Sequence, residues 1–134
     1  MANVEDIEGI GPAYGAKLKE AGCGTLEKLL AAGASKKGRQ EIAEKTGISE
    51  KLVLEWVNRA DLDRVKGVGS EYADLLEHAG VDSVPELATR NAANLAKKMA
   101  EINEEKNLVR QVPTESEVEG WVAHAKTLDR VVTH

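Results

Sequence analysis

Hydrophobic positions recur every three to four residues along most of the chain, and this spacing predicts helices. Near the start, Tyr14, Leu18 and Ala21 fall on one face of a helix that begins at Pro12. Proline suits the first helical position because its missing N–H has no partner there. Gly22 predicts a left-handed end to that helix. No segment alternates apolar and polar residues between turn signals, so the sequence predicts an all-α protein.

The rest of the first half contains three more predicted helices, each opened by a hydroxyl residue. Thr25, Ser35 and Ser49 precede their apolar stripes, and a hydroxyl oxygen at this position accepts a hydrogen bond from the first turn. Gly47 predicts the end of the helix that Ser35 opens. The helix after Ser49 carries Trp56 on its apolar face.

The second half has similar signals. Ser83 with Glu86, and Thr114 with Glu117, have the spacing of a capping box, in which two polar side chains bind the first turn reciprocally. Asn91 is predicted to cap the helix that lies between these two. We therefore expect helices in the same order as in the first half.

One sequence motif, here called the phrase, occurs twice in similar form. Residues 7–22 are IEGIGPAYGAKLKEAG and residues 65–80 are VKGVGSEYADLLEHAG, with the glycines and tyrosines in register. Such a repeat indicates one supersecondary unit copied and packed against its copy. We predict two repeats, residues 1–60 and 61–134, that form one pseudo-symmetric compact helical domain. Trp121 follows Trp56 at a wider spacing than the one that separates the two phrases, which predicts an insertion within residues 101–112.

The Gly-hydrophobe-Gly core of the first phrase predicts a tight turn before a helix. Gly9 and Gly11 leave backbone N–H groups exposed at the helix start, where the helix dipole attracts anions such as phosphate. A nucleic-acid backbone could approach Gly11 closely because it has no side chain. Ala13 and Lys17 follow in the first turns and complete the candidate site. The alternative is that this segment is only an inter-helix turn.

The second phrase has the same glycines in a more acidic setting. Glu71, Asp74 and Glu77 follow Gly67 and Gly69, and Lys66 is the only cation nearby in sequence. Carboxylates at a helix start compete for the dipole and repel phosphate. The sequence therefore predicts that Gly67 and Gly69 form a purely structural hairpin.

A basic cluster in the first half gives a second candidate surface. Lys36, Lys37 and Arg39 are close together at the start of a predicted helix. A solvated helix face is the simpler interpretation of such a cluster. If this face lies beside the first hairpin, the two could form one modest phosphate-binding surface.

Composition and charge limit the possible functions. The net charge is −5 and the pI is about 5.3, whereas nucleic-acid-binding domains usually have a basic stripe. No apolar run approaches the roughly 20 residues that span a bilayer. The first residues lack the basic and apolar regions of a signal peptide. The single cysteine, Cys23, excludes an internal disulfide. We expect a cytoplasmic protein without a membrane partner.

An enzyme needs clustered reactive groups, and the sequence offers none. His78, His124 and His134 are far apart, and Cys23 has no histidine or basic residue near it in sequence. Asp74 and His78 have the spacing of a surface pair on a helix. No nucleophile elbow, P-loop or dinucleotide fingerprint is present. We expect no catalytic activity and no metal cofactor.

The repeated phrases resemble the hairpins of tandem helix-hairpin-helix proteins, such as the C-terminal domain of the RNA polymerase α subunit. Nearly the whole chain also resembles a bacterial family of small proteins described as a domain of unknown function. This resemblance rests on residues 7–14, 47–51, 55–62 and 130–133. The broader resemblance implies nucleic-acid or protein binding without catalysis, and a hairpin that can hold a monovalent cation.

Two functions remain open from the sequence. The first is weak, sequence-independent binding of a nucleic-acid backbone through the first hairpin, helped by the basic cluster. The second is a protein-interaction or scaffolding module, which could associate with itself, in which both hairpins are structural. The acidic balance favours the second function, and the lysines near the first hairpin favour the first.

Overall fold

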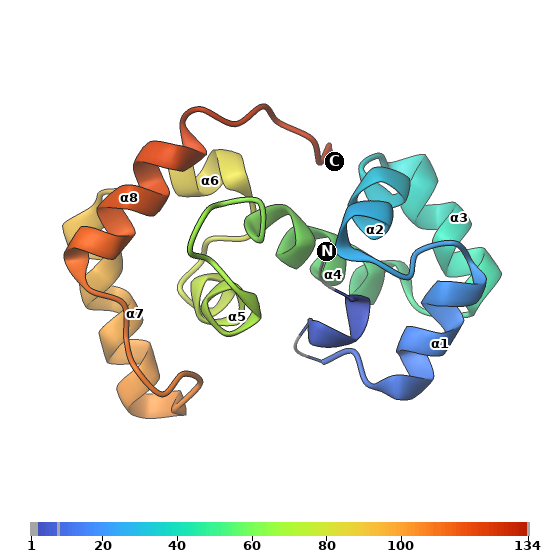
Figure 1. The fold of residues 1–134 in the computed structure, drawn as a ribbon, viewed down its shortest axis with the longest axis horizontal. Coiled ribbons are helices and arrows are strands. Elements are labelled where there is room, and N and C mark those ends of the chain that lie inside the picture. The colour runs from blue at the N-terminus through green and yellow to red at the C-terminus, as the bar shows by residue number, and fades with distance from the viewer. Residues whose placement is uncertain (1–2, 8, 134) are drawn as a thin grey trace. The chain divides into compact units, whose positions relative to one another are not determined.

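The computed structural model of this chain describes residues 3–7 and 9–133. Glu8, within the first repeated phrase, and His134 lie outside them. The described residues form eight α-helices and a 3₁₀ turn and contain no β-strand, which confirms the all-α prediction. In order along the chain (Figure 1), the helices are α1 (Pro12–Glu20), α2 (Leu26–Gly33), α3 (Lys36–Thr46), α4 (Glu50–Leu62), α5 (Ser70–His78), α6 (Val84–Ala88), α7 (Ala92–Lys106) and α8 (Glu115–Ala125).

The chain divides into two compact units. Unit 1 comprises residues up to Asp61 together with residues 131–134, and unit 2 comprises Leu62–Arg130. The division into two repeats, residues 1–60 and 61–134, stays a prediction. The segment from Val131 onward, which the sequence placed in the second repeat, belongs to unit 1. The chain therefore leaves unit 1 at the end of α4 and returns to it after α8.

Most predicted helix starts are formed as expected. The hydroxyls of Thr25 and Ser35 accept hydrogen bonds from N–H groups in the first turns of α2 and α3. Asn91 caps α7, and Thr114 and Glu117 form the predicted capping box of α8. These bonds satisfy N–H groups that have no partner inside the helix.

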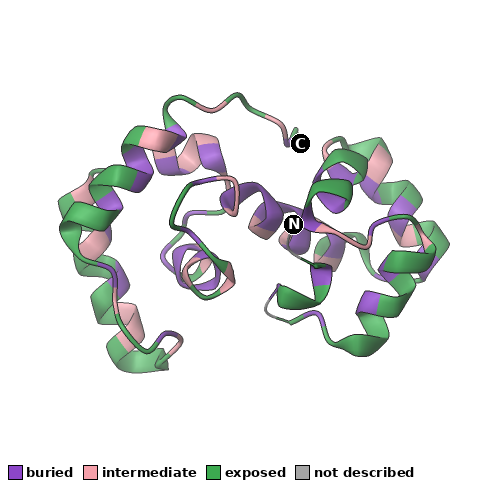
Figure 2. Cartoon of the chain, viewed as in Figure 1, coloured by how far each residue is buried: buried purple, intermediate pink, exposed green. Residues whose placement is uncertain are grey.

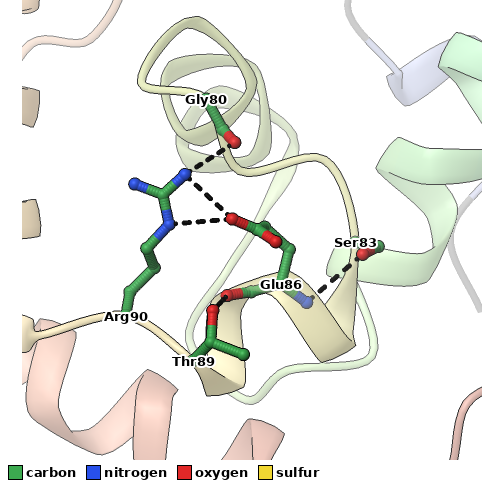
Figure 3. A network of polar contacts seen from close by, with 5 residues as sticks. All are labelled: Gly80, Ser83, Glu86, Thr89 and Arg90. Atoms are coloured by element: carbon green, nitrogen blue, oxygen red, sulfur yellow. Dashed lines mark hydrogen bonds and ion pairs between the residues drawn. The ribbon is translucent and has the colours of Figure 1, made fainter.

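The predicted capping box of α6 is only half formed. The Ser83 hydroxyl accepts from the Glu86 N–H at 3.3 Å, as expected. The Glu86 carboxylate, however, contacts Arg90, whose Nε and Nη2 both lie 3.0 Å from Oε1 (Figure 3). Arg90 also donates to the carbonyl of Gly80 at 2.9 Å. The prediction of a reciprocal box was wrong because a cation further along the chain attracts the carboxylate more strongly than a backbone N–H.

Each unit has its own apolar core, and buried positions alternate with exposed ones along the helices (Figure 2). The core of unit 1 includes Leu18, Leu29 and Trp56, and the core of unit 2 includes Leu76 and Trp121. Within unit 1, α2 packs on α3, and within unit 2, α8 packs on both α6 and α7. Burial of these apolar faces is the main driving force for folding.

The predicted insertion is part helix and part loop. α7 continues through residues 101–106 and ends at Asn107, which has a positive φ of 51°. The Asn103 side chain then accepts from the Val109 N–H at 2.8 Å and donates to the Val109 carbonyl at 3.1 Å. These two bonds fix the loop that carries Arg110.

Candidate nucleic-acid interface

The first hairpin has the geometry that its two glycines predict. Gly9 has a φ of +92°, a conformation that side-chain-bearing residues rarely adopt. The Ile10 N–H then donates to the Ile7 carbonyl at 3.1 Å and closes the turn. Gly11 is the N-cap of α1, has extended backbone (φ −87°, ψ −176°) and offers no side-chain cap. The start of α1 therefore relies on solvent or a ligand to satisfy its first N–H groups.

The start of α1 is open and carries no carboxylate. Gly11 and Ala13 are exposed, and a Cβ added at Gly11 would meet no atom within 4 Å. No acidic residue lies in the first turn, and Lys17 is exposed further along the helix. Lys19 is less available because it pairs with Glu5 at 3.3 Å. Lys17 is thus the lysine of α1 that is best placed to meet an anion.

The structure adds Arg59 to the surroundings of the first hairpin. A Cβ at Gly9 would lie 3.7 Å from Arg59 Nη1 and 3.9 Å from Trp56 Nε1. Arg59 and Trp56 are one helical turn apart on α4 and so share one helix face. Arg59 could not be predicted as a neighbour of the hairpin, because no local pattern showed that this face of α4 lies against the turn at Gly9.

The aromatic residues pack in pairs. The ring centroids of Tyr14 and Trp56 are 5.2 Å apart, as are those of Tyr72 and Trp121. Both tryptophans are buried, whereas Tyr14 is 38% exposed. The tilted pairs stabilise the packing of the helix after each hairpin. Trp56, Trp121 and Tyr72 therefore belong to or pack against the apolar cores, whereas Tyr14 covers Trp56 from the surface.

The three residues of the basic cluster at α3 differ in how far they are buried. Lys36 and Lys37 are exposed in the first turn of α3, as predicted. Arg39 is only 5% exposed, and its guanidinium donates to the carbonyls of Gly33, Ala34 and Thr133. Burial lowers the pKa of Arg39, although the charge of Glu50 acts in the opposite direction. Arg39 therefore does not belong to the exposed basic surface, because it is buried and both of its terminal nitrogens already donate to backbone carbonyls.

Lys36 and Lys37 give a separate basic surface. Lys36 lines a cavity of about 220 Å³ together with Arg39, Glu50 and Leu54. None of these residues belongs to the first hairpin. The two lysines add positive charge at the start of α3, where the helix dipole is also positive. Both lysines are therefore available to an anion at the start of α3.

The second hairpin has nearly the same backbone as the first. Gly67 has a φ of +93°, and Gly69 is the N-cap of α5 with extended backbone (φ −96°, ψ −173°). The Lys66 N–H donates to Nδ1 of His124 at 2.9 Å, a contact that the sequence analysis did not foresee. The separation between Arg59 and His124 in the sequence equals the separation between Trp56 and Trp121. An alignment that matches the two tryptophans therefore also matches Arg59 with His124.

The charges around the second hairpin differ in part from the prediction. Arg110, from the loop after α7, lines a shallow depression of about 440 Å³ with Gly67, Gly69 and Glu71. Lys66 is therefore not the only cation nearby, because the loop brings Arg110 from a distant part of the sequence. Asp74 is 7% exposed and belongs to the buried side of α5 rather than to its open start.

A negative field nevertheless remains at this hairpin. Burial raises the pKa of the Tyr72 hydroxyl, and the charges of Glu117 and Glu71 raise it further. The Tyr72 hydroxyl donates to the Gln111 carbonyl at 3.0 Å, which ties α5 to the loop. The depression therefore contains both an arginine and a carboxylate, whereas the start of α1 has no acidic residue in its first turn.

The reactive side chains are dispersed or buried. Within residues 3–7 and 9–133, no group of three or more His, Cys, Asp or Glu residues could hold a metal ion. Cys23 is 1% exposed, and burial raises its pKa, which keeps the thiol protonated at neutral pH. His78 Nδ1 lies 2.9 Å from the Asp74 carbonyl and 3.7 Å from its carboxylate. The absence of catalytic activity stays a prediction.

The fold is that of an all-α protein, and comparison with family models identifies the family. Residues 8–128 match the model of the Domain of unknown function (DUF4332) family, so the chain belongs to that family. The search of curated proteins and the search of solved structures find no match to this chain. None of the described helices is long and apolar enough to cross a membrane.

Proposed function

We propose that this protein is a non-catalytic binding module of two helix-hairpin-helix repeats that binds the phosphate backbone of nucleic acid through its first hairpin. The observation that carries the proposal is the exposed start of α1, which has no side-chain cap and no carboxylate in its first turn. Free N–H groups and a helix dipole at such a start attract phosphate. The equal glycine conformations at the two hairpins support the repeat.

The proposed contacts fall into two groups. The backbone at Gly11 and Ala13 would meet a phosphate directly, with Lys17 one turn further along α1 and Arg59 against Gly9. Lys36 and Lys37 would add long-range attraction. None of these groups is placed to identify a base, so the binding would be independent of sequence. With so few cations, we expect a Kd at the weak end of the roughly 10⁻⁴ to 10⁻⁶ M range that is typical of non-specific binding.

The experiment is a titration of fluorescently labelled duplex and single-stranded DNA with the protein across a salt series. Binding should be strongest at about 50 mM salt and should weaken as salt rises, because phosphate contacts release counterions. Lys17→Glu should reduce the affinity at low salt by about tenfold or more, since it reverses a charge beside the proposed phosphate. Absence of binding at the lowest salt would contradict the proposal.

A pair of matched substitutions tests the position of the site. Gly11→Leu and Gly69→Leu each place a leucine at a helix N-cap with extended backbone, and neither position has an atom within 4 Å of the new Cβ. Their effects on folding should therefore be similar. Gly11→Leu should block the approach of the nucleic-acid backbone and abolish DNA binding, whereas Gly69→Leu should leave DNA binding unchanged. Equal loss in both variants would place the site elsewhere.

A protein-interaction module is the second candidate function. The net charge of −5 favours it, because an acidic protein is repelled by nucleic acid at long range. Under this proposal both hairpins are architectural, and neither Lys17→Glu nor Gly11→Leu would change binding to a protein partner. The DNA titration separates the two functions, since only the first predicts salt-dependent binding of DNA.

A further inference from the structure

The segment Val131–Thr133, here called the strap, is held in unit 1 by both its backbone and its side chains. Val132 is 3% exposed and belongs to the core of unit 1, and Val131 packs against the same core. The Thr133 N–H donates to the Ala34 carbonyl at 2.8 Å, and the Thr133 hydroxyl lies 3.3 Å from the same oxygen. The strap is therefore bound at the end of α2, and it can be followed in Figure 1 near the label C.

Arg39 forms a second connection between the strap and the end of α2. Its Nη1 donates to the carbonyls of Gly33 at 2.8 Å and Ala34 at 3.1 Å, and its Nη2 donates to the Thr133 carbonyl at 2.6 Å. The last carbonyls of a helix lack intrahelical partners, and an arginine can satisfy them. Nη2 is directed instead to the strap. Without the strap, a buried charged donor would lose an acceptor, which is costly.

The way in which unit 1 holds the strap does not depend on the covalent connection to α8. Its polar contacts use the backbone N–H, the backbone carbonyl and the hydroxyl of Thr133, and its apolar contact is chiefly the side chain of Val132. Any extended segment with the same residues could make them. A cavity of about 220 Å³ lined by Arg39, Lys36, Glu50 and Leu54 remains open next to the guanidinium.

We propose that the groove formed by the end of α2 and by Arg39 is a docking site for the strap sequence, occupied within one chain in this structure and open to the strap of a second copy when its own is displaced. Exchange of an identical segment preserves every contact and is a general route to dimers at low cost. This docking site does not depend on the proposed nucleic-acid binding, because the strap and the first hairpin share no residue.

The first experiment measures binding of a peptide to the full chain. A labelled, end-capped peptide of residues 129–133 is titrated into the wild type and into Val132→Asp, whose own strap carries a charge in place of the buried valine. The variant should bind the peptide at least about tenfold more tightly than the wild type, in which the linked strap competes at high effective concentration. Arg39→Met in the same background should abolish binding, as should Val132→Asp in the peptide.

The second experiment tests the second copy as the occupant. Val132→Asp has a usable groove and a disabled strap, whereas Arg39→Met has an intact strap and a weakened groove. Each variant alone should sediment as a monomer, and an equimolar mixture should form a heterodimer. A mixture that remains monomeric at concentrations where the peptide binds would overturn exchange between copies.

The control experiment tests whether unit 1 of the variant is still folded. Circular dichroism and amide hydrogen exchange should show helices in Val132→Asp, with faster exchange near α2. If Val132→Asp unfolds unit 1, Val132→Ala replaces it in both experiments with the same expected order of affinities. Failure of a folded variant to bind the peptide more tightly than the wild type overturns the proposal, whatever the result of the DNA titration.

Discussion

The two hairpins have the same backbone and different surroundings. Gly9 and Gly67 have φ angles of +92° and +93°, and the helix after each begins at an extended glycine. The first hairpin lies against Arg59, whereas the Lys66 N–H of the second donates to His124. A repeated backbone therefore does not imply a repeated chemistry, because side chains from other helices set the charge and space around each turn.

The largest effect should come from truncating the matched leucines in the helices that follow the two hairpins. Leu18 and Leu76 occupy equivalent positions in the two phrases, and both are fully buried. Truncation to alanine leaves a cavity, so we expect Leu18→Ala and Leu76→Ala each to cost about 2–5 kcal/mol. Chemical denaturation followed by circular dichroism measures this loss. A cost under about 1 kcal/mol for one of them would show that its unit is packed differently from the other.

Alanine substitutions at the matched glycines Gly9 and Gly67 should destabilise the protein to different extents. Alanine at Gly9 or Gly67 must adopt a positive φ, which costs about 1–2 kcal/mol. At Gly67 the new Cβ would also lie 2.9 Å from Trp121 Nε1, whereas at Gly9 the nearest atom, Arg59 Nη1, is 3.7 Å away. Gly67→Ala should therefore be the more destabilising of the two by denaturation.

The control for this pair uses the other two glycines. Gly11→Ala and Gly69→Ala have ordinary φ angles and no atom within 4 Å of the new Cβ. Both glycines are N-caps, where alanine is less favourable than glycine, so the two substitutions should have similar costs of no more than about 1 kcal/mol. If Gly9→Ala proves as costly as Gly67→Ala, the tighter packing at the second hairpin does not affect stability.

A smaller effect is expected at the contact between the second hairpin and His124. His124→Phe keeps a ring but removes the acceptor of the Lys66 N–H. Loss of this hydrogen bond should cost about 0.5–1.5 kcal/mol. Amide hydrogen exchange provides the specific readout, because the Lys66 amide should exchange faster in the variant. Unchanged exchange at Lys66 would mean that the contact does not protect the turn.

The last comparison is at Cys23, which directly follows the first phrase as Val81 follows the second. Both are buried, so Cys23→Val should change stability by less than about 1.5 kcal/mol at neutral pH. Burial raises the pKa of the Cys23 thiol above its ordinary value, so the fold favours the protonated form. The thiol's contribution is therefore complete below the ordinary pKa of a thiol, about 8.5, and is lost as the pH rises through the higher folded-state pKa.

The pH dependence provides the test. Denaturation midpoints of the wild type should fall faster than those of Cys23→Val as the pH is raised from about 8 to about 10.5, a range that begins near the ordinary pKa of a thiol. Parallel curves would show that ionisation of Cys23 is not coupled to folding.

Local signals in the sequence predicted the helices well. Pro12, Thr25 and Thr114 mark helix starts, because each acts on backbone groups within three or four residues. The prediction failed at Glu86, where a local cap competes with Arg90, and at Arg39, where a basic run gave no sign of burial. Both failures involve long side chains that can reach several partners.

The sequence by itself determined the all-α class, the two glycine turns and the open start of α1, since these depend on residue type, periodicity and short spacings. Only the tertiary structure decided which charges surround each turn, that Arg39 is buried, and that residues 131–133 return to unit 1. The physical reason is separation along the chain. Arg39 and Thr133 are 94 residues apart, and no local pattern specifies a contact whose two halves are brought together only by folding.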